Sequence, residues 1–382
     1  MANIIYRIAR KIANIVLSTP LVKINNKKIV FDNFLGKGYG CNPKYITEEL
    51  IREGCDYELV WLVNDLNCEM PQQIRKVKHG GIRAMYEWAT AKIWIDNVRN
   101  YKGVNKKKNQ FYIQTWHSPL ALKKIEAEVE NMLSTEYVKA AKNDGKITDL
   151  MLVNNRYMEE LIRKYFWYDG KIMNIGLPRN DIIAKTTEEI INKVYSWFKL
   201  ERNTQLVIYA PTFRQNTDGV EVYKFDYSKV CDCLEKKFGV KFAMLLRLHP
   251  NVAKYKNELI YTDRIINASD YPDIQELLAV SSVTITDYSS TMFDSSMFGK
   301  PVFILAKDLE EYRAKERETE FELIDLPFTV ANNEEELCMN IEKFSKEIYN
   351  SKCYDFYKKI GLVKNDNASV EVVKIIKEEM QR

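Results

Sequence analysis

The sequence predicts an α/β protein built from two doubly wound, Rossmann-like domains. Three observations support this prediction. The chain has 382 residues, which is longer than one ordinary domain. Its 46% of hydrophobic residues can fill sizeable cores. Short apolar runs alternate with helix-like segments along most of the chain, a pattern typical of parallel sheets covered on both faces.

The elements fall into two series. The first series of predicted strands covers 27–32, 58–63, 91–96, 110–115, 149–153 and 172–175. A glycine-rich turn at 36–40 follows the first strand, and Asn42 and Pro43 open a helix. A polar helix over 186–200 precedes the second series, which covers 205–211, 240–247, 265–267, 283–286 and 301–305. Two such series predict a GT-B-like fold, in which two domains face a cleft.

This pattern also predicts where the domains begin and end. We expect an N-terminal amphipathic helix in residues 1–26, a Rossmann-like domain in 27–184, a second in 185–350, and C-terminal helices in 351–382.

Composition excludes several classes of protein. A formal net charge of +4 is small for this length and does not indicate nucleic-acid binding. The seven cysteines are odd in number and form no CxxC pair, so we expect neither a disulfide framework nor a zinc site. Reduced, structural thiols indicate a cytoplasmic protein.

The segment from Ile4 to Leu17 predicts an amphipathic helix. Its isoleucines recur at helical spacing, while Arg7, Arg10 and Lys11 lie on the other side. It lacks the unbroken apolar centre and cleavage site of a secretory signal. Such a helix can lie in the interface of an anionic membrane or dock on the protein's own core, and the sequence leaves both alternatives open.

Polar residues follow three predicted strands of the second series. Ligands of open α/β sheets bind outside the carboxyl ends of the strands, so these residues predict a pocket for an anionic nucleotide. A hydroxyl-rich helix start suits phosphate, although the same residues are common as plain N-caps. The residues concerned are Arg214, Arg247, His249, Asp287, Ser289, Ser290 and Thr291.

One of the three histidines, His117, lies at a strand end in the first series, within Gln114–Leu120. A histidine there can pack, hold a metal or transfer a proton. The third histidine, His79, lies in a basic turn, where we expect it to be solvated.

Five ordered motifs resemble those of the CDP-glycerol glycerophosphotransferase family, the teichoic-acid primases and polymerases. They are QTWHSPLALKK, GLPRND, YAPTFR, LRLHPN and ITDYSSTMFD, and the opening KKIVFDNFLGKGYGCNPKYI also agrees. One motif departs from the family. The histidine is usually followed by Gly-Thr-Pro-Leu-Lys, whereas Ser118 and Pro119 follow it here, which leaves the exact acceptor open.

The resemblance implies a reaction and roles for the residues. An alditol phosphate would pass from CDP-glycerol or CDP-ribitol to a hydroxyl of a lipid-linked saccharide or polyol-phosphate acceptor, with release of CMP. It implies His117 as the base in an N-terminal acceptor domain, and His249 as the catalytic partner that binds the pyrophosphate or assists the leaving CMP in a C-terminal donor domain. Arg214, Arg247, Asp287, Ser289, Ser290 and Thr291 would surround the phosphates. Arg179, Asn180 and Asp181 would either position the donor or fix the hinge.

The remaining expectations concern the cofactor, the location and an alternative. No metal or other cofactor is required, although magnesium could act through the substrate. The protein would lie at the inner face of the bacterial cell membrane, on an anionic surface. A GT-B glycosyltransferase that uses a nucleotide sugar is the alternative, and it would release UDP or GDP rather than CMP.

Overall fold

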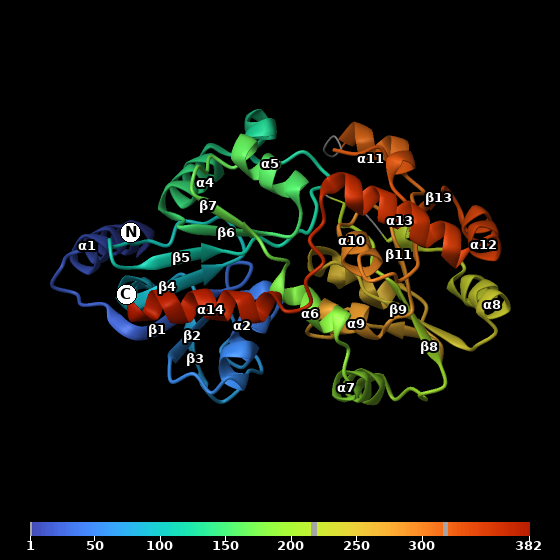
Figure 1. Cartoon of the computed structure of the whole chain (residues 1–382), viewed down its shortest axis with the longest axis horizontal. Coiled ribbons are helices and arrows are strands. Elements are labelled where there is room, and N and C mark those ends of the chain that lie inside the picture. Colours follow the sequence, from blue (N-terminus) through green and yellow to red (C-terminus); the bar gives the residue numbers. More distant parts are fainter. Residues whose placement is uncertain (1, 215–219, 316–319) are drawn as a thin grey trace. The chain divides into compact units, whose positions relative to one another are not determined.

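The structure, a computed structural model, describes residues 2–214, 220–315 and 320–382 (Figure 1). The chain forms two compact units, each interrupted in sequence. The first unit contains the residues up to 117 together with 125–181 and 363–382, and the second contains 118–124 and 182–362.

The first unit contains a seven-stranded, fully parallel sheet with the order β3-β2-β1-β4-β5-β6-β7. Its strands are β1 (Asn25–Asp32), β2 (Glu58–Val63), β3 (Ile74–Lys78), β4 (Ala91–Asp96), β5 (Phe111–Gln114), β6 (Leu150–Val153) and β7 (Lys171–Asn174). Its helices are α1 (Ala2–Leu17), α2 (Cys41–Arg52), α3 (Ile82–Thr90), α4 (Thr135–Ile147), α5 (Arg156–Tyr165) and α14 (Ala368–Gln381), with 3-10 turns η1 (Glu126–Met132) and η2 (Pro178–Asn180).

Side chains of β1 alternate between two cores, as a strand buried on both faces requires. Ile29 and Phe31 lie in a core with residues of α2 and α14. Val30 lies in another core with residues of α1 and α3. One face of the sheet is therefore covered by α2 and α14, and the other by α1 and α3.

The second unit contains a six-stranded parallel sheet with the order β10-β9-β8-β11-β12-β13. Its strands are β8 (Gln205–Tyr209), β9 (Phe242–Leu246), β10 (Ile265–Asn267), β11 (Val283–Thr286), β12 (Val302–Leu305) and β13 (Thr329–Ala331). Its helices are α7 (Glu188–Phe198), α8 (Tyr227–Phe238), α9 (Ile274–Val280), α10 (Thr291–Ser296), α11 (Leu309–Lys315), α12 (Glu334–Glu342) and α13 (Lys346–Ile360), with 3-10 turns η3 (Glu221–Tyr223), η4 (Pro250–Glu258) and η5 (Leu323–Asp325). The short helix α6 (Asp181–Ala184) joins the units in sequence.

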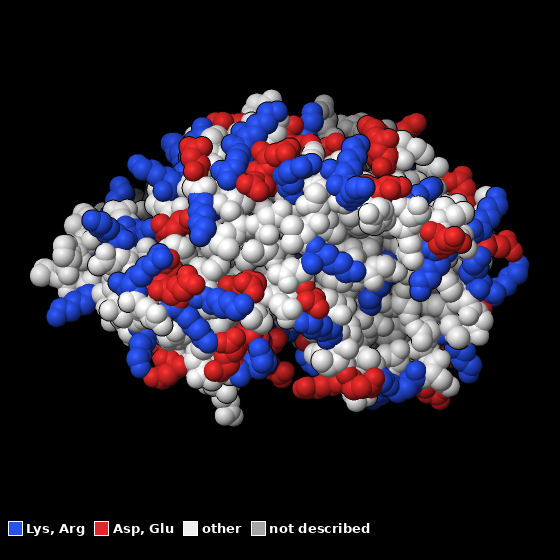
Figure 2. Space-filling model, in the orientation of Figure 1, with Lys and Arg blue, Asp and Glu red and all other residues white. Residues whose placement is uncertain are grey.

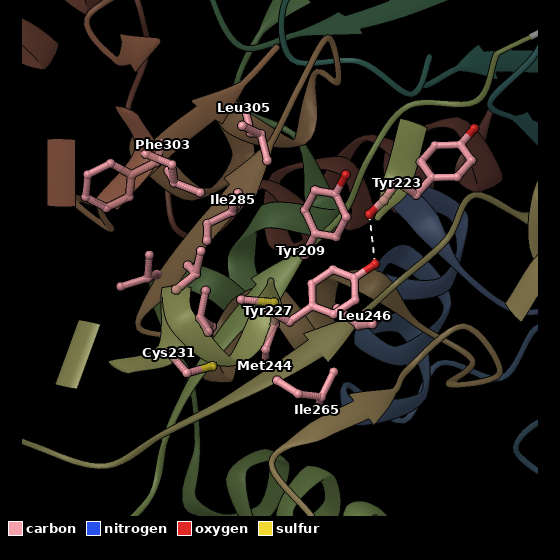
Figure 3. Close-up of a cluster of buried hydrophobic side chains, with 14 of the residues drawn as sticks. Tyr209, Tyr223, Tyr227, Cys231, Met244, Leu246, Ile265, Ile285, Phe303 and Leu305 are labelled. Carbon is pink, nitrogen blue, oxygen red and sulfur yellow. Dashed lines mark hydrogen bonds between the residues drawn. The ribbon is translucent and has the colours of Figure 1, made fainter. Parts of the chain in front are cut away.

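The same alternation organises the second unit. Val207 and Tyr209 of β8 pack with α8 and α12, whereas Leu206 and Ile208 pack with α7 and α9. Figure 3 shows the first of these cores, where Tyr227 donates its hydroxyl hydrogen to the carbonyl of Tyr223. Two parallel sheets covered on both faces confirm the predicted α/β, GT-B-like fold class.

The units differ from the predicted boundaries in two places. Residues 351–382 do not form a separate segment, because α14 buries Val372 and Ile376 in the core of the first unit, while Tyr357 of α13 hydrogen-bonds Ser296 in the second. Residues 118–124 also belong to the second unit although they follow His117 directly, and Glu320 donates its backbone N–H to the carbonyl of Leu122.

Two general properties concern the helices and the cysteines. Among residues 2–214, 220–315 and 320–382, no helix combines the length and apolar character needed to cross a bilayer. All seven cysteines are free thiols.

Lys300 provides a test of the packing in the second unit. Its Nζ donates to the carbonyls of Leu278 (2.8 Å), Ala279 (2.5 Å) and Ser281 (2.9 Å) at the end of α9, and burial lowers the pKa of Lys300 to about 8. Lys300→Met should destabilise this unit by about 1–3 kcal/mol, because buried carbonyls lose their donor. A melting curve would measure the loss. The exposed Lys343→Met is the matched control, and equal melting temperatures for both variants would contradict the assignment.

Candidate functional site

In each unit the predicted site residues lie near the point where the strand order reverses. That point lies between β1 and β4 in the first sheet and between β8 and β11 in the second. Open α/β sheets bind their ligands outside the carboxyl ends of the strands at such points.

His117 follows β5 and is held by a backbone carbonyl. Its Nδ1 lies 2.8 Å from the carbonyl oxygen of Asn97. Because a carbonyl oxygen only accepts, Nδ1 carries the hydrogen, and in a neutral ring Nε2 retains its lone pair. The structure therefore selects one tautomer of His117.

The surroundings of His117 keep the ring neutral. Burial and the positive charge of Arg179 lower the pKa of His117 to about 4, against the opposing effect of the hydrogen bond to Asn97. The residue still has a partly exposed surface. At neutral pH this imidazole can accept a proton at Nε2.

Two aromatic rings fix the plane of the imidazole. The ring of Trp116 lies 4.3 Å from that of His117, and the ring of Phe34 meets it edge-on at 5.1 Å. Both residues have left-handed backbones, with φ of 52° at Trp116 and 46° at Phe34. Such conformations cost roughly 1 kcal/mol or more in bulky residues and collect at functional sites.

Asn42 joins the segment before His117 to two other elements. Its side chain donates to the carbonyls of Thr115 (3.2 Å) and Trp116 (2.9 Å) and accepts the backbone N–H of Arg179 (3.1 Å). The residue is fully buried at the start of α2. The sequence identified Asn42 only as a helix start, since these partners lie far along the chain.

The predicted group Arg179, Asn180 and Asp181 divides into separate roles. The carboxylate of Asp181 accepts the N–H groups of Ala368 (3.0 Å) and Ser369 (2.8 Å), so it caps α14. Arg179 lies near α2, with Nη1 3.7 Å from the sulfur of Cys41. Asn180 is buried beside it in η2. Asp181 thus has a structural contact with α14, while the roles expected of the three residues at the donor or the hinge stay predictions.

The environment of His79 differs from the predicted solvated turn. Its Nε2 lies 3.0 Å from Oδ2 of Asp32, and only 23% of its side chain is exposed. The hydrogen bond to Asp32 raises the pKa of His79 despite partial burial. The expectation of a solvated histidine was wrong, because the turn folds back onto the end of β1.

In the second unit, Arg214 and Asp287 form the centre of a buried network. Arg214 donates to Asp287 (2.8 Å) and, through two nitrogens, to Asp308 (2.7 and 3.0 Å). It also donates to the carbonyl of Thr212 at 2.7 Å. Asp287 accepts the backbone N–H groups of Thr212 and Tyr288. These contacts join the carboxyl ends of β8 and β11.

Arg247 is also held by protein groups. Its Nη1 donates to the carbonyls of Ala268 (2.8 Å), Ser269 (3.1 Å) and Tyr271. Burial lowers the pKa of Arg247. Arg214, Arg247 and Asp287 therefore shape the edge of the sheet, while their predicted contact with donor phosphates stays a prediction.

His249 differs from these residues because it is exposed. Its ring stacks on Phe213 with centroids 5.8 Å apart, and its Nδ1 accepts the N–H of Asn251 at 3.2 Å. In a neutral ring the hydrogen is then on Nε2, from which it can be donated. Phe213 precedes Arg214, so the network around Arg214 also positions His249 indirectly.

The hydroxyl-rich segment opens α10. Thr291 donates its hydroxyl to that of Ser289 at 2.9 Å, and its backbone N–H lies 3.4 Å from the same oxygen. Ser290 occupies the N-cap position without a side-chain capping bond. The plain capping interpretation therefore does not account for the Ser290 hydroxyl.

Sequence reasoning missed the aromatic and acidic partners of Arg214. Tyr288 and Tyr312 stack on each other at 3.8 Å, and the guanidinium of Arg214 lies over both rings. Asp308 follows β12, and this position after a strand was the one available signal. Across the described ranges, with 215–219 and 316–319 set aside, no three His, Cys, Asp or Glu side chains are arranged to hold a metal ion.

Comparison with known proteins identifies the family. The CDP-glycerol:poly(glycerophosphate) glycerophosphotransferase family matches residues 14–378. The chain belongs to this family.

Relatives within the glycerophosphotransferase family include polymerases and a transferase. The chain is 30% identical over 370 residues to the teichoic acid poly(glycerol phosphate) polymerase of Staphylococcus epidermidis, covering 94% of this chain and 51% of that protein. It is 31% identical over 304 residues to the teichoic acid glycerol-phosphate transferase of Staphylococcus aureus, covering 76% and 77%. The chain thus spans about half the length of the first relative.

A solved family structure extends the comparison to the fold. The wall teichoic acid polymerase TagF superposes with a TM-score of 0.84 at 27% identity, covering 100% of this chain and 96% of that one. Another TagF structure, a histidine-to-asparagine variant soaked with CDPG, gives a TM-score of 0.83 at 28% identity, covering 100% and 98%.

Arg214 provides a test of the network in this family member. Arg214→Met should leave Asp287 and Asp308 buried without a counterion, which typically costs about 3–5 kcal/mol. Burial raises the pKa of Asp308, but Arg214 outweighs that effect and holds the pKa below its ordinary value of 3.8. The stabilisation is therefore present above pH 4 and is lost as the carboxyl becomes protonated.

Denaturant titrations of both proteins at several pH values would measure this effect. The difference in unfolding free energy between wild type and variant should shrink from pH 7 to about pH 4, because the unpaired Asp308 carboxyl of the variant becomes protonated first. Arg202→Met, at an exposed ion pair, is the matched control. A gap that does not depend on pH would contradict the assignment.

Proposed function

We propose that the chain transfers glycerol phosphate, or another alditol phosphate, from a CDP-alditol to an acceptor hydroxyl and releases CMP. The observation that supports this most directly is His117, held neutral at the switch point of a family member with its Nε2 lone pair able to accept a proton. The product would be teichoic acid or a related cell-wall or capsular polymer. The proposed acceptor is a lipid-linked saccharide or polyol phosphate.

In the proposed reaction the acceptor oxygen attacks the β-phosphorus of the donor. The new P–O bond forms as the bond to the bridging oxygen breaks, and CMP leaves with that oxygen and its electron pair. The hydroxyl proton passes to Nε2 of His117. General bases of this kind typically contribute about 10²–10⁴-fold to the rate.

The second unit supplies donors for the charge on the phosphates. His249 can donate from Nε2, while Ser289, Ser290 and Thr291 offer hydroxyls and backbone N–H groups at the start of α10. Hydrogen-bond donors that are already in place stabilise charge that develops on phosphoryl oxygens. Magnesium would enter only with the diphosphate of the substrate.

His117→Gln should reduce turnover by about 10²–10⁴-fold and leave the affinity for CDP-glycerol unchanged, because the base acts on the acceptor. His249→Ala should instead weaken donor binding. Calorimetry with CDP-glycerol and single-turnover assays of CMP release would separate the two effects. Near-normal turnover of His117→Gln would remove it from the mechanism, and release of UDP or GDP from a nucleotide sugar would support the glycosyltransferase alternative.

We also propose that α1 holds the protein at the inner face of the membrane, where lipid-linked acceptors lie. The exposed fractions are 52% for Ile8, 56% for Ile12 and 70% for Ile15. Ala13 and Leu17, on another side of the helix, pack into the core. The docked alternative therefore accounts for one side of α1 and leaves the isoleucine side uncovered.

Neighbouring residues extend this apolar surface. An open groove of about 680 Å³ between α1 and α3 is lined by Ile12, Val16, Ile82 and Tyr86, with Arg83 beside them. Figure 2, in the orientation of Figure 1, shows lysine and arginine side chains next to uncharged surface in the region of α1. The side chains of Ile4, Ile5 and Arg7 lie outside the described part. Each cation near an anionic leaflet contributes about 1 kcal/mol, and apolar burial adds to it.

Replacing Ile8, Ile12 and Ile15 by Asn should weaken binding to anionic vesicles by more than about tenfold, since each loses apolar burial in the interface. Vesicle co-sedimentation at two salt concentrations would measure the change, and salt should weaken binding by the wild type. Ile260→Asn and Ile324→Asn, at exposed sites of the second unit, are matched controls. Equal binding by the triple variant would show that another surface docks.

A further inference from the structure

The segment after β4 provides the carbonyl that holds His117. Asn97 is fully buried there, and each of its polar groups has a partner. Its backbone N–H donates to Oδ1 of Asp96 at 2.7 Å, and its carbonyl accepts from His117 at 2.8 Å. Both the backbone N–H and the backbone carbonyl of Asn97 are therefore held by hydrogen bonds.

The side chain of Asn97 holds a second element beside His117. Its Oδ1 accepts the backbone N–H of Phe34 at 2.9 Å, and its Nδ2 donates to Oδ1 of Asn33 at 2.8 Å. Phe34 then packs its ring against the imidazole. One residue thus contacts His117 through its carbonyl and supports the neighbouring ring through its amide.

The chemistry of this position requires an amide. The Phe34 N–H needs an acceptor and the Asn33 oxygen needs a donor, and asparagine supplies both on one short side chain. A carboxylate would lack the donor. Leucine, although similar in volume, would leave buried polar groups without partners.

The backbone around this contact is strained, which makes the support necessary. Phe34, Leu35 and Gly36 follow one another with positive φ of 46°, 60° and 79°. Left-handed residues of this size persist only where their surroundings hold them. The bond from the N–H of Phe34 to Asn97 is one such constraint.

We propose that Asn97 is a positioning residue that orients His117 and keeps it in the Nδ1–H tautomer with Nε2 unprotonated. This inference rests on the proposed role of His117 as the base. Asn97 acts through His117 and Phe34 and needs no contact with substrate. Replacing its side chain by that of alanine leaves the carbonyl in place but removes the hydrogen bonds to Phe34 and Asn33. Phe34 would then no longer hold the imidazole against that carbonyl, and the ring could rotate.

Nitrogen NMR of the full chain tests this without reference to activity. The chain has only three histidines, and His117→Gln identifies the signals of His117 by their absence. The wild type should show protonated Nδ1 and unprotonated Nε2 at pH 7. Asn97→Ala should show a mixture of tautomers, with the pKa of His117 moving from about 4 toward its ordinary value of 6.5.

Kinetics supply the second readout. Asn97→Ala should lower kcat on the order of 10²-fold, a size typical of a misplaced reacting group, without changing the affinity for CDP-glycerol. The acid limb of its rate profile should move to higher pH. The charged group that acts on this imidazole from a neighbouring turn is Arg179, and it is unchanged in the variant.

Asn100→Ala is the matched control. Asn100 donates to Oδ2 of Asp96 at 2.7 Å, so it belongs to the same segment, but its side chain holds neither Phe34 nor His117. The His117 tautomer signals and the kcat of Asn100→Ala should equal those of the wild type. If Asn97→Ala does not fold, Asn33→Ala is the second variant. It removes one of the two hydrogen bonds made by the side-chain amide of Asn97, and it should shift the nitrogen signals of His117 in the same direction by a smaller amount.

The outcomes distinguish this proposal from the proposed function. An unchanged tautomer and an unmoved acid limb in Asn97→Ala would overturn the positioning role, even if stability fell. Loss of turnover in His117→Gln together with normal turnover in Asn97→Ala would overturn it while leaving the base in place. Normal turnover in His117→Gln would remove the base itself.

Discussion

The first unit depends on an ion-pair network around Lys102. Its Nζ lies 2.5 Å from Asp96 and 3.3 Å from Asp144, and all three side chains have no exposed surface. Arg99 adds a contact to Asp144 at 3.2 Å. Removing one partner of a buried pair typically costs about 3–5 kcal/mol, so the segment from Asp96 to Lys102 is held firmly. That segment carries the carbonyl of Asn97, and through it the geometry of His117.

In both units, buried ion pairs hold the carboxyl ends of the strands in place. These charged groups lie near each switch point. The histidine beside them, His117 in the first unit and His249 in the second, remains at least partly exposed to solvent. In the second unit Arg214 pairs with Asp287 and Asp308, and His249 lies exposed on the neighbouring Phe213. The paired charges at these edges therefore maintain structure, while His117 is partly exposed and His249 is exposed.

The sequence was informative where the chain is locally regular. Buried strands such as β4 and β11 are short apolar runs, and their predicted bounds agree with the structure. β3 was missed because its sequence IRKVK mixes cations with apolar residues at a sheet edge. The short strand β13, at an edge of the second sheet, was missed as well.

The candidate site was predictable only in part. The positions of His117 and His249 after strands followed from the strand pattern. The roles of Asn97, Asn42 and Asp308 did not, because their partners are fixed by tertiary contacts. Asp181 shows the same limit, since the helix that it caps lies beyond the whole second unit in sequence.

The division of the chain into interrupted units has a consequence for folding during synthesis. Growing chains generally fold domain by domain from the N-terminus. Here the core of the first unit includes Val372 and Ile376 of α14, which the ribosome adds only after the second unit is complete. The first unit therefore cannot complete its core while the second unit is being synthesised. During that time the apolar surface around Ile46 and Leu50 is only partly covered. The second unit is therefore the first that can fold to completion. The core of the first unit is completed only when α14 packs onto it.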